Sequence, residues 1–257
     1  ENVNPSNKRN LVELTRQLRE FKERFEKAFG LSISDESLWE SIRIYNRNRE
    51  LLSKLYDLRR QNLGLLSGRE VLAIVQSAMV MPKDEHSDLL EKLLAELEKR
   101  KPATNNNVRL WLSGQLCQPP RVDLLNSIER VGAVIVDDDL YYGYRYFAGN
   151  TPLNGDPLEA MAKRYLYMPI FCPTRVDSEQ NWGEQLVKRA KESKAQGVII
   201  LMANYCEAHA MFYPSVREKL SAAGIPNMMI QTEYETVSLR GEETRVQAFV
   251  EMVRMKS

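Results

Sequence analysis

Apolar side chains recur at every third or fourth position through the first hundred residues, which places them on one face of a helix. The row from Leu11 to Phe29 is the clearest example, and Ser34 before Asp35 and Glu36 has the side chain of a helix N-cap. The pattern predicts four amphipathic helices. They run from Asn7 to Phe29, from Ser34 to Leu58, from Ser67 to Met79 and from His86 to Lys99.

The pattern changes after a polar linker at 101–107, because short apolar runs then alternate with helical segments. The runs at 108–112, 133–136, 197–203 and 227–231 predict strands, and the segments at 121–131, 156–165, 182–195, 214–223 and 241–255 predict helices. This alternation is typical of a parallel sheet with helices on both faces. We therefore predict a mostly helical region, residues 1–106, followed by an α/β domain, residues 107–257, of Rossmann-like or flavodoxin-like type.

Composition limits the classes of partner. The 257 residues include 36 Lys and Arg and 35 Asp and Glu, so the net charge of +1 gives little support for nucleic-acid binding. No apolar run approaches the roughly 18 residues that a membrane span requires. The cysteines, Cys117, Cys172 and Cys206, are odd in number and far apart, which favours reduced thiols. We expect a soluble, cytoplasmic protein with neither nucleic acid nor membrane as a partner.

Ligands of open α/β sheets bind at the carboxyl ends of the strands. Polar or reactive groups follow the predicted strands at 113–114, 137–139, 204–207 and 232–233. Cys206 follows the most hydrophobic strand. Its thiol is a candidate nucleophile with His209 as base, a redox thiol or a metal ligand, or else a small buried hydrophobe. Because loops converge in space, Cys172 and Cys117 could join it, and soft thiolates leave an iron–sulfur cluster as one option.

Two other features have competing interpretations. The three aspartates at 137–139 could bind Mg²⁺, or could cap a helix and pair with an arginine such as Arg145. The aromatic run from Tyr141 to Phe147 could pack a loop over the sheet or wall an apolar acyl or aryl pocket. The chain has no Walker, Gly-x-Gly-x-x-Gly, Cys-x-x-Cys or His-Glu-x-x-His sequence, which removes the usual support for dinucleotide and P-loop chemistry.

Several short segments together resemble the 2-hydroxyacyl-CoA dehydratase and class I benzoyl-CoA reductase subunit family. They are DLL at 123–125, IE at 128–129, GA at 132–133, VDDDL at 136–140, GYRYF at 143–147, CPTR at 172–175, GVII at 197–200, NYCE at 204–207, YP at 213–214, AGIP at 223–226, IQTE at 230–233 and TRVQAFVEM at 244–252. The similarity covers residues 107–252 and extends less sharply to the helices before them, at Asn46, Asn48 and Arg49.

The resemblance implies a subunit that pairs with a second homologous subunit, holds an iron–sulfur cluster of the 4Fe-4S type and acts on an acyl-CoA. An ATP-hydrolysing activator protein would supply the electron. By position, Cys206 matches a cluster-ligating cysteine, and Cys172 and Cys117 are further candidates. We expect substrate-binding residues at the strand ends and assign no catalytic residue. These substrate-binding candidates are Ser113, Asp138, Arg145, Glu207 and Glu233.

The reaction, the completeness of the chain and the class of protein each leave alternatives open at this point. The family uses one scaffold both to reduce an aromatic acyl-CoA and to dehydrate a 2-hydroxyacyl-CoA, and the aromatic run slightly favours reduction. Such subunits usually carry a further N-terminal α/β domain, so we expect this chain to be a fragment or a shortened relative. Two other classes of protein compete with an acyl-CoA enzyme subunit. One is a non-catalytic module that binds CoA, a nucleotide or a partner subunit, and the other is a zinc or thiol enzyme using Cys206 and His209.

Overall fold

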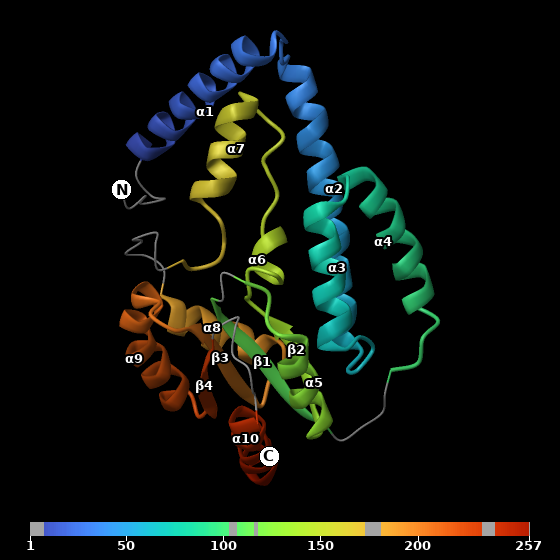
Figure 1. Cartoon of the computed structure of the whole chain (residues 1–257), viewed down its shortest axis with the longest axis vertical. Helices are drawn as coiled ribbons and strands as arrows, with labels where there is room; N and C mark the ends of the chain where they lie inside the picture. The colour runs from blue at the N-terminus through green and yellow to red at the C-terminus, as the bar shows by residue number, and fades with distance from the viewer. Residues whose placement is uncertain (1–7, 103–106, 116–117, 173–180, 233–239, 257) are drawn as a thin grey trace.

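Four parallel strands form one sheet in the order β2-β1-β3-β4 (Figure 1). The computed structural model describes residues 8–102, 107–115, 118–172, 181–232 and 240–256. The strands are β1 (Val108–Gln115), β2 (Ala133–Asp138), β3 (Gly197–Ala203) and β4 (Asn227–Thr232). The predicted parallel sheet is confirmed, and each predicted strand lies within an observed one.

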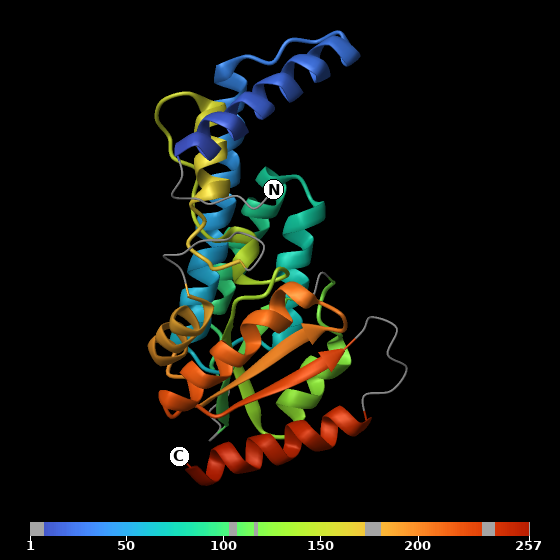
Figure 2. The same cartoon turned by 90° about the vertical axis from the view of Figure 1, so that its left-hand side faces the viewer.

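Helices cover both faces of the sheet, as predicted (Figure 2). Side chains alternate between the faces along each strand, so Leu110 and Leu112 of β1 point to one core cluster and Trp111 to another. The helices α5 (Val122–Arg130) and α10 (Arg240–Lys256) cover the first face. The helices α8 (Trp182–Glu192) and α9 (Glu207–Ala222) cover the second.

The helical region contains α1 (Lys8–Phe29), α2 (Asp35–Gln61), α3 (Gly68–Val80) and α4 (Lys83–Leu97). Two predicted helix starts are confirmed by their caps, because Ser34 accepts a hydrogen bond from the amide of Ser37 and Ser67 forms a reciprocal capping box with Glu70. Helix α4 begins earlier than predicted, directly after Pro82, and its first turn carries acidic side chains that suit a helix N-terminus.

Two short helices connect the sheet to the helical region. Helix α6 (Tyr144–Phe147) was not predicted as a helix, and its Phe147 packs into the apolar cluster of α2, α3 and α4. Helix α7 (Pro157–Leu166) packs against α1. Division of the chain into separate domains near residue 106 stays a prediction.

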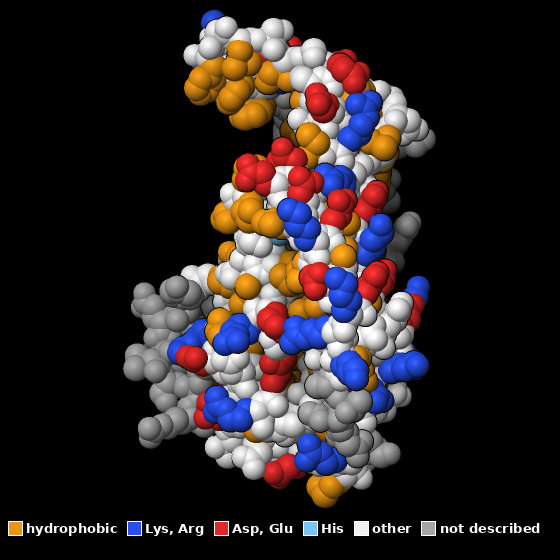
Figure 3. Space-filling view, turned by 90° about the vertical axis from the view of Figure 1, so that its right-hand side faces the viewer, with side chains coloured by type: hydrophobic (Ala, Val, Ile, Leu, Met, Phe, Trp, Pro, Cys, Tyr) orange, Lys and Arg blue, Asp and Glu red, His pale blue; other side chains and the backbone are white. Residues whose placement is uncertain are grey.

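The outer half of α1 leaves a row of aromatic side chains exposed. The rings of Phe21, Phe25 and Phe29 follow one another along the helix, at 6.1 Å and 4.5 Å between centroids. Figure 3 shows hydrophobic side chains gathered on the underside of this overhanging end of the molecule. The stripe that predicted α1 is therefore only partly used in packing.

Helix α9 corrects one prediction. The sequence analysis placed its start at Pro214, a residue that is common in the first turn of a helix. The helix begins instead at Glu207, with Cys206 as its N-cap and Pro214 inside it. A proline inside a helix removes one backbone hydrogen bond without having to end the helix. The thiol of Cys206 therefore lies at the N-terminus of α9, just beyond the end of β3.

The strand order places a topological switch between β1 and β3. The chain passes from β1 to β2 on one side and later returns to β3 on the other, and such a reversal opens a crevice at the carboxyl ends of the two strands. The strands approach closely here, because Gly114 has φ +112° and a Cβ atom on it would lie 2.0 Å from the carbonyl oxygen of Leu201. Ser113 and Cys206 are both near this crevice.

Candidate functional site

The thiol of Cys206 lies 3.0 Å from Nδ1 of His209, one helical turn away. Cys206 is half-buried, whereas the His209 side chain is buried and packs edge-on against the Trp182 ring, at 5.7 Å between centroids. Burial, with a smaller contribution from the positive charge of Arg145, lowers the pKa of His209 to about 4. The imidazole is therefore neutral near pH 7, so it carries one N–H and one acceptor nitrogen.

Arg145 of α6 connects this pair to the loop that contains Cys172. The guanidinium donates hydrogen bonds to the backbone oxygens of Asp139, at 3.3 Å, and of Phe171, at 2.8 Å. Cys172 follows Phe171 directly and is half-buried, with its Sγ atom 3.9 Å from the hydroxyl of Tyr141. The ring of Tyr141 in turn lies under the Arg145 guanidinium, at 5.1 Å.

Unpaired polar atoms gather in the same part of the fold. Among the described residues, the buried side-chain nitrogens without a hydrogen-bond partner are Nη2 of Arg145, Nε1 of Trp182, Nε2 of His209 and Nε1 of Trp111. Both tryptophans belong to the core cluster under α8 and α9. Buried groups of this kind are normally paired, since leaving one unpaired costs about 1–3 kcal/mol. Donors from Arg145 and Trp182 beside a thiol indicate a place for a ligand with acceptor atoms.

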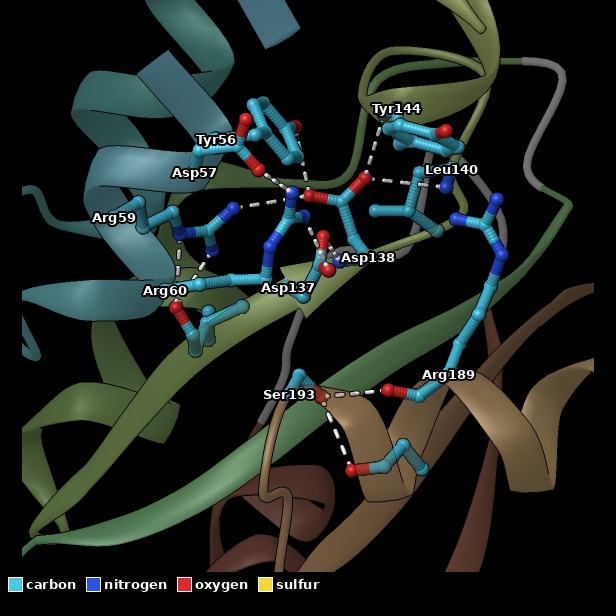
Figure 4. A network of polar contacts seen from close by, with 12 residues as sticks. Tyr56, Asp57, Arg59, Arg60, Asp137, Asp138, Leu140, Tyr144, Arg189 and Ser193 are labelled. Carbon is cyan, nitrogen blue, oxygen red and sulfur yellow. Dashed lines mark hydrogen bonds and ion pairs between the residues drawn. The ribbon is translucent and has the colours of Figure 1, made fainter. Parts of the chain in front are cut away.

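The aspartates at the end of β2 are engaged by the fold itself. Asp138 accepts hydrogen bonds from the hydroxyl of Tyr56 at 2.8 Å, from Arg59 at 3.2 Å and from the amide of Tyr144 at 3.0 Å (Figure 4). It is buried in these contacts. The neighbouring Asp137 forms an ion pair with Arg60 at 2.7 Å. Sequence reasoning named Arg145 as a partner of this acidic run, and Arg145 does bond the backbone oxygen of Asp139, but it missed the two arginines at the end of α2.

Ser113 and Asp139 also bind each other. Ser113 is fully buried and donates to one oxygen of Asp139 at 3.1 Å, while the amide of Gly114 donates to the other oxygen at 3.1 Å. Burial raises the pKa of Asp139, although these hydrogen bonds and Arg145 oppose the shift. The predicted substrate-binding residues Ser113 and Asp138 are thus occupied by contacts within the protein.

The other predicted site residues lie in different settings. Glu207 is exposed in the first turn of α9, and Cys117 and Glu233 lie outside the described residues. Within the described ranges, no three His, Cys, Asp or Glu side chains are grouped as a metal site. Of the predicted substrate-binding residues that are described, Arg145 is the one with an unpaired buried donor.

The aromatic run from Tyr141 to Phe147 divides between two environments. Tyr144 and Phe147 pack edge-on against each other at 5.2 Å and belong to the helical core with Tyr56. Tyr141 alone contacts Arg145 and Cys172. The run therefore mostly packs the fold, and a single ring of it borders the candidate site.

The burial of Asp137 predicts a pH dependence of stability. Burial, partly offset by Arg60, raises the pKa of Asp137 from 3.8 to about 6. Between these values the folded protein holds a proton that the unfolded chain lacks, so the carboxyl stabilises the fold at low pH and loses this contribution as the pH rises through 6. In urea titrations at pH 4 to 7, wild type should lose stability relative to Asp137→Asn as the pH rises. A stability difference between the two proteins that stays constant from pH 4 to 7 contradicts the prediction.

The described helices contain no segment that is both long and apolar enough to cross a membrane. The fold and the site define an α/β protein with a parallel sheet and a thiol at its topological switch point. The chain matches the family model for 2-hydroxyglutaryl-CoA dehydratase, D-component, over residues 4–253, and it belongs to that family. The resemblance that the sequence predicted is confirmed.

Curated relatives of the chain are named as subunits of an acyl-CoA reductase and of acyl-CoA dehydratases. One subunit of the benzoyl-CoA reductase of Thauera aromatica is 28% identical over 246 residues, which cover 95% of this chain and 63% of the relative. The (R)-phenyllactyl-CoA dehydratase beta subunit of Clostridium sporogenes is 29% identical, covering 89% and 60%. The beta subunit of the (R)-2-hydroxyglutaryl-CoA dehydratase of Acidaminococcus fermentans is 26% identical, covering 90% and 62%. The chain thus spans somewhat under two thirds of these relatives.

Proposed function

We propose that this chain is part of a subunit of an iron–sulfur enzyme that either reduces an aromatic acyl-CoA or dehydrates a 2-hydroxyacyl-CoA. The family supports this, because its named members include subunits of both kinds of enzyme. The observation that carries the proposal is the half-buried thiol of Cys206 beside His209, which packs on Trp182, because the buried nitrogens Nε2 of His209 and Nε1 of Trp182 have no hydrogen-bond partner. A second homologous subunit, an ATP-hydrolysing activator and a cytoplasmic location are parts of the same proposal.

Cys206 is the residue that would hold the cluster. Iron–sulfur clusters are bound by cysteine thiolates, and this thiol lies at the carboxyl end of β3, where ligands of such sheets bind. Cys172 is the second candidate, since Arg145 connects its loop to the site. The described residues contain no group of three such ligands, so Cys117, another part of the protein or a partner chain would complete the set. A bound cluster of the 4Fe-4S type would supply single electrons at low potential.

The surrounding side chains would bind and orient the thioester. The unpaired nitrogens of Arg145 and Trp182 are donors that a carbonyl oxygen can accept from. The ring of Phe171 packs between the rings of Trp182 and Phe212, at 6.4 Å and 5.2 Å, and this apolar group limits the access of water. Neutral His209 would hold the Cys206 sulfur through Nδ1.

Both reactions stay within the proposal. Tyr141 is the aromatic residue of the 141–147 run that borders the site. The structural support for a pocket that binds an aryl group is therefore one aromatic side chain. The choice between them is made by assay of the assembled enzyme with benzoyl-CoA and with a 2-hydroxyacyl-CoA.

The test is iron and acid-labile sulfide analysis of the protein purified anaerobically with its co-expressed partner subunit. We expect about four of each per chain, as for a four-iron cluster, with a visible absorption band. Cys206→Ser should lose most of both, and Cys172→Ser is the matched variant that shows whether the second thiol is a ligand. Circular dichroism verifies that each variant folds.

Two outcomes would contradict the proposal. An iron-free wild type that still binds an acyl-CoA supports the non-catalytic binding module instead. Zinc in place of iron, with zinc lost in Cys206→Ser, supports the thiol or zinc enzyme that pairs Cys206 with His209.

A further inference from the structure

Three cationic side chains from different helices converge around two tyrosines, away from the thiol site. The Arg49 guanidinium of α2 and the Lys83 ammonium of α4 lie 5.6 Å and 5.4 Å from the ring centre of Tyr45. Lys83 also lies 5.9 Å from the ring of Tyr146, whose backbone oxygen accepts a hydrogen bond from Arg164 of α7 at 3.4 Å. Three cations that are far apart in the sequence thus border one region.

None of the three forms an ion pair with an acidic group in the described part of the chain. Arg49 donates to the amide oxygen of Asn46 at 2.8 Å. Arg164 donates to the backbone oxygens of Gly149, at 3.0 Å, and of Tyr146. Lys83 donates to the backbone oxygens of Ala78 and Met81. All these acceptors are uncharged, so the three positive charges are not neutralised.

Holding these charges together costs the fold free energy. Burial, and next the positive charge of Arg164, lower the pKa of Arg49 to about 10. Burial also lowers the pKa of Arg164. No carboxylate is among the groups that shift either pKa. Because an anion between the arginines would reverse this penalty, the arrangement favours a negatively charged ligand.

The base of the cluster is preorganised. Asn46 is buried and exchanges two hydrogen bonds with the backbone of Thr151, at 2.8 Å and 2.9 Å. These bonds fix the loop before α7 against α2, and the same Asn46 holds the Arg49 guanidinium. A site whose donors are already in place binds its ligand with a smaller entropy cost.

We propose that Arg49, Lys83 and Arg164 form a phosphate-binding site that takes a phosphate group of coenzyme A. Planar guanidinium groups bind phosphate through paired N–H donors, and the ammonium adds a point charge. Tyr45, with 46% of its surface exposed, offers a ring on which an adenine base can stack. The assignment to coenzyme A rests on the proposed function, whereas the affinity for phosphate rests on the three cations alone.

The position of the site suits a long ligand. Tyr146, which borders the cations, directly follows Arg145, which borders the thiol. Helix α6 therefore borders both sites, one through Arg145 and the other through Tyr146. A ligand with phosphates at one end and a thioester at the other, joined by a flexible arm, could occupy both.

The test compares the affinities of coenzyme A, dephospho-coenzyme A, pantetheine and inorganic phosphate by calorimetry, on the full chain with its partner subunit. We expect Arg49→Gln and Arg164→Gln each to weaken coenzyme A binding at least tenfold and to leave pantetheine binding unchanged. Arg43→Gln is the matched control, because it removes one positive charge from the exposed face of α2, where Arg43 pairs with Glu36. It should change the affinity less than twofold. Lys83→Gln serves as a third variant if an arginine variant fails to fold.

The outcomes separate the site from the proposed function. If all variants bind coenzyme A as tightly as Arg43→Gln does, the proposed phosphate site is wrong and the proposed function still stands. Inorganic phosphate that binds in an Arg49-dependent way, with no binding of coenzyme A, keeps the phosphate site and overturns both its assignment to coenzyme A and the proposed substrate class. Dephospho-coenzyme A that binds more weakly than coenzyme A places the 3′-phosphate at the cations.

Discussion

The substitution Asp138→Asn is expected to lower the free energy of unfolding by about 3–5 kcal/mol, because it leaves a buried charge without its partner. The Arg59 guanidinium is buried, and in the described part of the chain it donates hydrogen bonds to Asp138 and to the backbone oxygen of Ile135. Asparagine keeps an oxygen for the hydroxyl of Tyr56 but removes the negative charge. Urea unfolding monitored by circular dichroism at pH 7 measures the loss.

Two further variants make this prediction specific. Asp123→Asn removes an exposed carboxylate paired with Arg121 at 3.3 Å, and it should cost less than about 1 kcal/mol. Adding Arg59→Met to Asp138→Asn should restore part of the lost stability, since the unpaired charge is then gone. A loss for Asp138→Asn no larger than that of Asp123→Asn would show that the buried pair does not stabilise the fold.

The substitution Gly114→Ala is expected to cost about 3 kcal/mol or more, through backbone strain and steric overlap together. Gly114 has φ +112°, a conformation that side chains with Cβ rarely adopt, and the new methyl would lie 2.0 Å from the carbonyl oxygen of Leu201. Both strands would have to separate at the switch point. Thermal and urea unfolding measure the lost free energy of unfolding. Separation of the strands should also weaken the hydrogen bond from the Gly114 amide to Asp139.

Gly155→Ala is the matched control. Gly155 has φ +82°, with nothing within 4 Å of a built Cβ atom, so alanine there adds only the strain of the left-handed backbone. That strain is about 1–2 kcal/mol. Equal losses at the two positions would mean that the close approach of β1 and β3 contributes nothing.

Local signals predicted most of the fold. The Ser67 and Glu70 side chains mark the start of α3 through contacts three residues apart, and the apolar run from Gly197 to Ala203 has the bounds of β3. Helix α6 escaped prediction because its four residues make barely more than one turn, which is too short to show a helical repeat. The start of α9 was misplaced because Pro214 is a first-turn signal that also occurs inside helices.

The site could be predicted only in part. The position of Cys206 after a buried strand indicated a thiol at the sheet end, and the structure pairs it with His209, three residues away. The partners of the acidic run were not predictable, because Arg59 and Asp138 are 79 positions apart and nothing in a single sequence links them. The same reason hid Trp182 and the cationic group of Arg49, Lys83 and Arg164, which form only when distant helices pack.

Pro214 divides α9 into two halves, one before and one after the proline. Proline has no N–H, so the helix lacks one backbone hydrogen bond at its middle. The second half is anchored by the buried Val216 and Leu220. The first half exposes Met211 and contacts the core through the buried His209 and through Phe212, whose ring packs on Phe171 at 5.2 Å. We therefore expect the amides of the first half to exchange hydrogen faster than those of the second. Cys206 caps the half of the helix that lies before this missing hydrogen bond, at the opposite end from the buried Val216 and Leu220.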